Sequence, residues 1–227
     1  MTSPAFVEQF LNMKLAVLVA ILGALAPSVV TGQTRRVGPA GAEPDRVAQA
    51  YEQFLQAHSL EETDVDGAIA AYKRAMTLDP SASSIPADLA DLYLRESRAQ
   101  EAMQYAEQAL RLAPDNHDAH RVLGTVYATL ASMPEAQRSN RAAQRENLAK
   151  AVDHLERAIE PPMSAADANL RAMLVRLYMA TDAYDKAIPV LVDLIKQEPG
   201  WQDGPGLLLE AYSAAGRTAD GMGSTLT

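Results

Sequence analysis

Residues 111–127 read RLAPDNHDAHRVLGTVY, and this stretch decides between two kinds of protein. It holds two histidines three positions apart with two aspartates beside them: His117, His120, Asp115 and Asp118. Such a cluster is compatible with the beginning of a metal site. Alternatively, Pro114 ends one helix, because proline cannot continue a helix interior, and Asp115 or Asn116 caps the next helix. The first interpretation favours an enzyme and the second favours a scaffold.

The sequence around this stretch repeats with a period of 34 residues. Pro80 and Pro114 are 34 positions apart, and each closes a segment rich in alanine and leucine. Each repeat contains a leucine, an apolar or small residue directly after it, and a tyrosine three positions further on. The copies are Leu89, Ala90 and Tyr93; Leu123, Gly124 and Tyr127; Leu174, Val175 and Tyr178; and Leu208, Leu209 and Tyr212. Repetition at such a period is typical of stacked helical units.

The spacing within one unit predicts a pair of antiparallel helices. Leu89, Ala90 and Tyr93 stand at i, i+1 and i+4, which is one face of a helix. The small residue at position 90 or 124 allows a neighbouring helix to approach closely. A second narrow apolar face follows after a short turn, at Ala102, Ala106, Ala109 and Leu110. One pair is too small to bury its own apolar face, so we expect the copies to stack.

These residues resemble the tetratricopeptide repeat family, whose pattern has Leu-Gly-x-x-Tyr on the first helix, alanines and an aromatic on the second, and a closing proline. The resemblance implies an all-α fold, a right-handed superhelix (α-solenoid) of antiparallel helix pairs over residues 45–220. The expected repeats are about 48–82, 83–116, 117–167 and 168–201, with a partial repeat at 202–220 and a disordered tail at 221–227.

The unit that opens at His117 departs from the pattern. Tyr127 and Ala151 are 24 residues apart, whereas Tyr93 and Ala102 are nine apart, so about 15 residues are inserted near 132–147. Ser132 with Glu135 has the spacing of a capping box. We therefore expect a helix to begin here, as an extra or elongated helix that continues through residue 158.

Composition and charge restrict the classes of partner. The net charge of −9 makes nucleic acid or an anionic membrane an unfavourable partner. Without cysteine there is no disulfide, thiol nucleophile or cysteine-bound zinc. Neither a nucleophile elbow nor a phosphate-binding loop is present. The sequence thus favours a non-enzymatic protein without a cofactor, and we interpret the histidines as part of an ordinary helix start rather than as metal ligands.

The N-terminus has the pattern of an export signal. Residues 15–26 (LAVLVAILGALA) form an uncharged apolar run preceded by Lys14, which is short for a membrane span but typical of a signal peptide. We expect a signal over residues 1–32, with the true start possible at Met13, and a flexible leader at 33–44. The expected location is periplasmic or secreted, without membrane insertion after cleavage; an uncleaved, signal-anchored form is the alternative.

The resemblance implies that the first helices of the pairs line a concave groove that holds a peptide or helix segment of a partner protein. The positions that correspond to such a groove are Asp91, Arg95, Arg121, Thr125, Arg176 and Met179. Their arginines suggest an acidic or amphipathic segment. The function expected from the sequence is a scaffold or adaptor of the cell envelope. The alternative is the targeting or regulatory region of a longer, possibly enzymatic, polypeptide that is truncated near Asp220.

Overall fold

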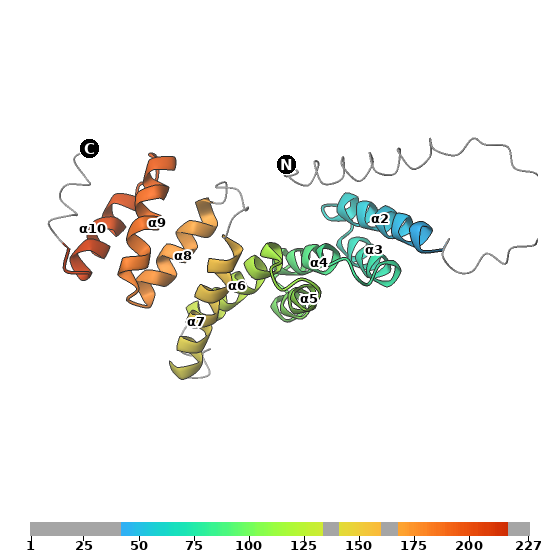
Figure 1. Cartoon of the computed structure of the whole chain (residues 1–227), viewed down its shortest axis with the longest axis horizontal. Helices are drawn as coiled ribbons and strands as arrows, with labels where there is room; N and C mark the ends of the chain where they lie inside the picture. Colours follow the sequence, from blue (N-terminus) through green and yellow to red (C-terminus); the bar gives the residue numbers. More distant parts are fainter. Residues whose placement is uncertain (1–41, 134–140, 160–167, 218–227) are drawn as a thin grey trace, which may run out of the picture. The chain divides into compact units, whose positions relative to one another are not determined.

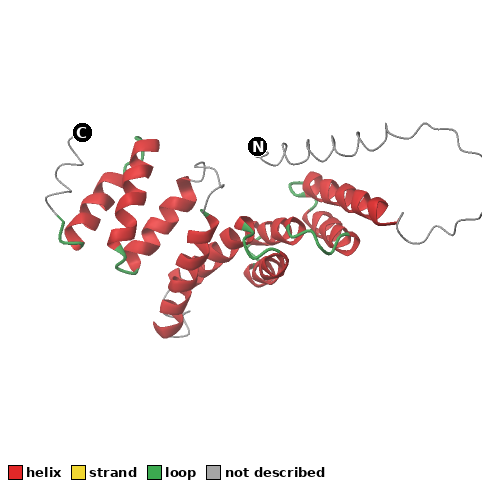
Figure 2. Cartoon of the chain, in the orientation of Figure 1, coloured by secondary structure: helices red, strands yellow, loops and turns green. Residues whose placement is uncertain are grey.

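The computed structural model describes residues 42–133, 141–159 and 168–217, and these residues form helices joined by turns (Figures 1 and 2). The described part contains nine helices and no strand. The helices are α2 (Ala42–Leu60), α3 (Val65–Leu78), α4 (Ser84–Arg95), α5 (Ala99–Leu112), α6 (His117–Ser132), α7 (Arg141–Ala158), α8 (Ala168–Ala180), α9 (Tyr184–Gln197) and α10 (Gly204–Ala214). The all-α expectation is confirmed.

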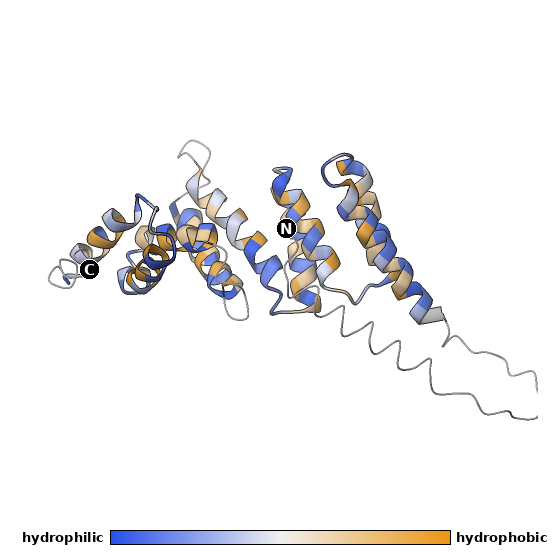
Figure 3. Ribbon diagram, turned by 90° about the horizontal axis from the view of Figure 1, so that it is seen from above, coloured by the Kyte–Doolittle hydropathy of each residue, from blue (hydrophilic) through white to orange (hydrophobic). Residues whose placement is uncertain are grey.

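Each helix packs mainly against its neighbour in the chain. The pairs are α2 with α3, α4 with α5, α6 with α7 and α8 with α9, and α10 packs against α9. In addition, α6 packs against both α4 and α5, so successive pairs are stacked there. Figure 3 shows apolar and polar residues alternating along the helices, as expected for helices with one buried face.

The repeat tyrosines mark the end of the first helix in most pairs. The residue four positions after the tyrosine has a positive φ in three cases, Ser97 (59°), Asp182 (57°) and Gly216 (71°). In each case the next backbone N–H donates to the tyrosine carbonyl at 2.8 Å, which closes a left-handed helix C-terminus. The same position after Tyr127 is Ala131, which is buried and still helical. The insertion therefore replaces a tight turn by an extension of α6.

The small residue of the repeat allows the close approach that the sequence predicted. A Cβ atom on Gly124 would lie 2.7 Å from Cγ of Leu155 and 3.2 Å from its backbone nitrogen. These distances are too short for a side chain, so α6 and α7 approach more closely here than any larger residue would permit.

The buried side chains form two clusters that meet at α6. The first cluster runs from Phe54 to Val126 and the second from Ala128 to Tyr212, and Tyr127 packs against both. In the first, the alanines of the second helices are fully buried, at Ala68, Ala75, Ala102, Ala106 and Ala109. Stacked pairs thus share their cores with neighbours, as expected for a repeat protein.

Two details of the sequence interpretation require correction. The capping box is wrong, because Ser132 is the last residue of α6 and its hydroxyl donates to the carbonyl of Ala128 at 2.8 Å. Residues 42–44, expected in the leader, belong to α2. The expectation of an elongated second helix is correct, since α7 runs unbroken from Arg141 to Ala158.

Several expectations lie outside the described residues. They are the signal over 1–32, most of the leader, part of the insertion and the tail at 221–227. Among the described residues, none of the helices combines the length and the apolar content that crossing a membrane requires.

Candidate functional site: a polar network across the first helices

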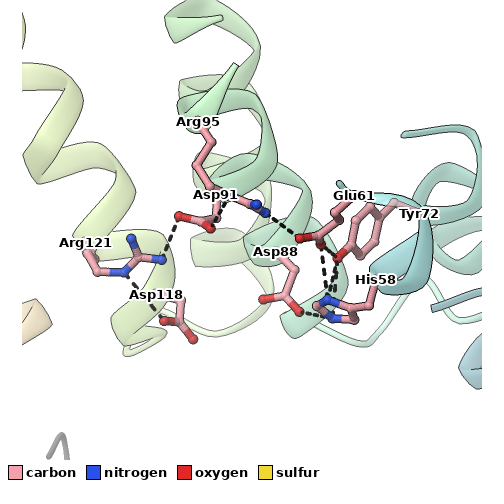
Figure 4. Close-up of polar contacts among 8 residues, drawn as sticks. All are labelled: His58, Glu61, Tyr72, Asp88, Asp91, Arg95, Asp118 and Arg121. Carbon is pink, nitrogen blue, oxygen red and sulfur yellow. Dashed lines mark hydrogen bonds and ion pairs between the residues drawn. The ribbon is translucent and has the colours of Figure 1, made fainter. Parts of the chain in front are cut away.

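A connected set of polar side chains runs from α2 across α4 to α6 (Figure 4). We call this set the first-helix network. Its members are His58, Glu61, Tyr72, Asp88, Asp91, Arg95, Asp118 and Arg121. Apart from Tyr72 on α3, every member lies on a first helix of a pair or in the turn that follows it. The network therefore joins three successive repeats along one face.

At the α2 end, His58 lies between a carboxylate and a phenol. Its Nε2 is 3.2 Å from Asp88 Oδ2, and its Nδ1 is 3.2 Å from the Tyr72 hydroxyl. The hydrogen bond to Asp88 raises the pKa of His58 above its usual value. The hydroxyl of fully buried Tyr72 donates to Glu61, and burial raises the pKa of Tyr72 well above its usual value. A phenol held in this way is a structural donor and not a nucleophile.

In the middle of the network two arginines alternate with carboxylates. Arg95 contacts Glu61 at 2.6 Å and Asp91 at 3.2 Å. Arg121 contacts Asp91 at 2.9 Å and Asp118 at 3.8 Å. Asp91 thus bridges two guanidinium groups from successive repeats. Because the side chains of Asp91 and Arg121 are both largely buried, their ion pair is screened less than an ordinary surface pair.

The charge of the network is negative when His58 is neutral. Its carboxylates are Glu61, Asp88, Asp91 and Asp118, against the guanidinium groups of Arg95 and Arg121. Asp118 is the most exposed of these acids, with 63% of its side chain accessible. This face therefore presents the carboxylate of Asp118 to solvent, whereas both of its arginines form ion pairs within the network.

The structure brings together four of the six residues that the sequence singled out. Asp91, Arg95 and Arg121 are linked by ion pairs, and Thr125 stands one turn beyond Arg121. The Thr125 hydroxyl donates to the Arg121 carbonyl at 2.8 Å, which holds it against its own helix.

Arg176 and Met179 lie apart from that group, on α8, which packs against α7 and α9. Arg176 is exposed and has no ion-pair partner among the described residues. Met179 is partly buried against the second core cluster.

The sequence predicted three of the eight members of the network as site residues, Asp91, Arg95 and Arg121. Glu61 lies in the turn after α2, and its contact with Arg95 joins residues one repeat period apart. Both the His58–Asp88 and the Asp91–Arg121 contacts join residues 30 positions apart. A search for opposite charges at separations of 30 to 34 residues would have found these pairs, because that separation places them on adjacent repeats.

The structure gives the histidines of residues 111–127 other partners than a metal. His117 Nδ1 is 2.8 Å from the carbonyl of Arg157, and His120 is buried between Pro114 and His154. Asn116 caps α6, its side chain accepting from the Ala119 N–H at 2.8 Å. Within the described ranges, no group of three or more His, Cys, Asp or Glu residues has a metal-binding arrangement. The interpretation of these histidines as part of a helix start is confirmed, since α6 begins at His117, and the structure adds that His120 is buried.

A separate hollow lies on another side of the first pair. It has a volume of about 540 Å³ between α2 and α3 and is lined by Gln49, Glu52, Gln53, Gln56, Arg74, Thr77 and Leu78. None of the residues predicted as partner contacts lines it. Arg74 within it already donates to Gln53 at 2.6 Å.

Comparison with known proteins agrees with this architecture. Residues 59–123 match the sequence model of the tetratricopeptide repeat family. The solved structure of YrrB, described as a TPR protein with an unusual peptide-binding site, matches with a TM-score of 0.60 and 22% identity over 82% of this chain and 87% of that one. The MamA protein matches with a TM-score of 0.57 and 20% identity over 78% of this chain and 88% of that one. No curated protein sequence matches.

The paired helices and the polar network across the first helices define the class of protein, which is an all-α stack of repeats. More particularly, residues 59–123 match the tetratricopeptide repeat model, and solved structures of similar fold cover most of the chain.

Proposed function

We propose that this protein is a non-enzymatic scaffold that binds a segment of a partner protein on the face formed by α4 and α6. The observation that carries the proposal is the first-helix network, which places partly exposed Asp91, Arg95 and Arg121 on adjacent repeats. Tetratricopeptide folds support the proposal, since YrrB is described as having a peptide-binding site. Thr125 extends the same face by one helical turn.

The ion pairs change the partner that we expect. Arg95 and Arg121 each contact two carboxylates, so a purely acidic segment would have to displace those partners. Exposed Asp118 favours a basic side chain instead. We therefore propose an amphipathic segment that places a lysine or arginine near Asp118. Arg176, which is exposed on α8, is a second candidate contact for an acidic group.

The experiment compares partner capture by charge-reversed variants. Asp118→Lys changes the proposed face and Arg176→Glu changes the second candidate contact on α8, whereas Asp193→Lys and Lys196→Glu make the same charge changes on exposed positions of α9. We expect loss of captured partner for the first two variants and capture equal to wild type for the α9 controls. Circular dichroism confirms that each variant is folded. Equal capture by all five proteins contradicts the proposed face.

We further propose that the protein acts after export, in the periplasm or outside the cell. Support comes from the apolar run at residues 15–26, with Lys14 before it and small residues before Gln33. The test is N-terminal sequencing of the mature protein from its host. A mature N-terminus near Gln33 supports export with cleavage, whereas an intact N-terminus in the cytoplasm contradicts it.

A further inference from the structure

His120 and His154 form a partly buried contact between α6 and α7. Their Nδ1 atoms are 2.8 Å apart, and the Nε2 of His120 is 3.0 Å from the carbonyl oxygen of Pro114. Only 2% of His120 is exposed. The contact joins the start of the first helix to the second helix of the same pair, in the unit that carries the insertion.

The hydrogen bonds assign the protons of this pair. A carbonyl oxygen only accepts, so the Nε2 of His120 carries a hydrogen and, in the neutral ring, its Nδ1 accepts. The Nδ1 of His154 is therefore the donor. One added proton can be placed on Nε2 of His154 without breaking this bond. A second added proton has no such place, because it would turn two N–H groups toward each other.

The surroundings do not offset a doubly protonated pair. His117 and Arg157 add positive charge, and Asp153 opposes it from an exposed position. Lys150 is a further cation beside His154, and Glu107 of α5 acts on Lys150.

The remaining charges on packed neighbours have other partners. From α4, Asp91 pairs with Arg121. On the side of α7 toward α8 and α9, Glu156 pairs with Tyr178 and Lys186.

The pair lies where the two core clusters meet. The ring of His154 stacks on Tyr127 with centroids 5.7 Å apart and an angle of 8°. Tyr127 is the side chain that packs against both clusters. Opening the contact between α6 and α7 at His154 would therefore loosen the connection between the first core and the second.

We propose that His120 and His154 form an acid-sensitive latch, whose double protonation releases α7 from α6 and uncouples the α2–α6 core from the α7–α10 core.

The direction of the pH effect follows from proton linkage. Burial is the main cause that lowers the pKa of both histidines, and His120 lowers the pKa of His154 further. The closed state thus binds fewer protons than the open state. Its stability from this pair is fully present above about pH 6.5 and is lost as the pH falls below that value.

His58 works in the opposite direction, since its pKa is raised and its contribution to stability is lost as the pH rises. A readout that is local to α6 and α7 is therefore needed.

The test is hydrogen exchange of α6 and α7 between pH 7.5 and 5.5, corrected for the intrinsic pH dependence of exchange. For wild type we expect the local opening constant to rise up to roughly 100-fold over this range, about tenfold for each of the two histidines. His154→Asn keeps an amide donor near the Nδ1 position and removes one titrating group, so the rise should be tenfold or less. The matched control is His58→Asn on α2, which removes a histidine outside α6 and α7 and should show the wild-type rise in these two helices.

Two results would overturn the latch. One is a wild-type opening constant in α6 and α7 that does not change with pH. The other is an equal rise in wild type and His154→Asn. If His154→Asn opens α7 already at pH 7.5, the wild-type histidine titrations by NMR decide: two independent midpoints near 6.5, without shifts in α7, would also contradict the proposal.

Discussion

At the scale of single residues, Gly124 shows how one position sets the distance between two helices. The sequence predicted a small residue at this repeat position, and the structure places the side chain of Leu155 where a Cβ atom of residue 124 would lie. Gly124→Ala should lower the free energy of unfolding by roughly 1–2 kcal/mol, because overpacking exceeds the gain in helix propensity. Chemical denaturation measures the change.

The control for this prediction is Gly206→Ala on α10. No atom lies within 4 Å of a Cβ at Gly206, so the gain in helix propensity is unopposed. We expect this variant to be as stable as wild type or slightly more stable. Equal effects of the two substitutions would mean that the contact with Leu155 carries no strain.

The role of a residue could be predicted from the sequence where it depends on neighbouring residues, and could not where it depends on a partner far along the chain. Pro114 was predicted to mark a helix end, and Asn116, which caps α6, was one of the two predicted caps beside Asp115. The role of Ser132 was predicted wrongly, and the burial of His120 was not predicted. The role of Ser132 depends on how far α6 continues, and the burial of His120 depends on His154, 34 positions away.

At the scale of elements, the turns between paired helices contain an unfavourable backbone conformation. Ser97 adopts φ 59°, which costs a residue with a Cβ about 1–2 kcal/mol. Ser97→Gly should therefore raise the stability by roughly 0.5–1 kcal/mol, after the entropy cost of glycine is subtracted. The measurement is the midpoint of thermal unfolding.

Ala113→Gly serves as the comparison, because Ala113 ends α5 with φ −138° and has no strain to relieve. That substitution should lower the midpoint. A lower midpoint for Ser97→Gly as well would contradict the claim that the positive φ of Ser97 is unfavourable.

The helix pairs were predictable because the same spacing of leucine and tyrosine recurs in several repeats. Leu89 and Tyr93 and their copies each fixed the buried face of a first helix. The end of α6 was not predictable in this way, because the insertion removes the turn that follows the tyrosine in other units. Three of the eight residues of the first-helix network were predicted, since Asp91, Arg95 and Arg121 stand at repeat positions, whereas Glu61 stands in a turn.

At the scale of the whole molecule, the two core clusters predict uneven stability along the chain. Leu174→Ala removes a fully buried side chain from the second cluster and should cost about 2–5 kcal/mol. In a repeat protein such a loss affects neighbouring units most. Hydrogen exchange should therefore accelerate in α7–α10 more than in α2–α5.

Leu89→Ala in the first cluster is the reciprocal variant and should accelerate exchange in α2–α6. Uniform acceleration by both variants would mean that the described helices unfold as one unit, despite the two clusters.

The central claim is that α4 and α6 form the partner-binding face, and mapping a bound peptide tests it most directly. A peptide from a captured partner is added to the wild-type protein, and changes in backbone NMR signals are measured for every described helix. We predict that the largest changes occur on α4 and α6 around Asp91, Arg121 and Thr125. Changes confined to α5 and α9, or to the hollow between α2 and α3, would contradict the claim.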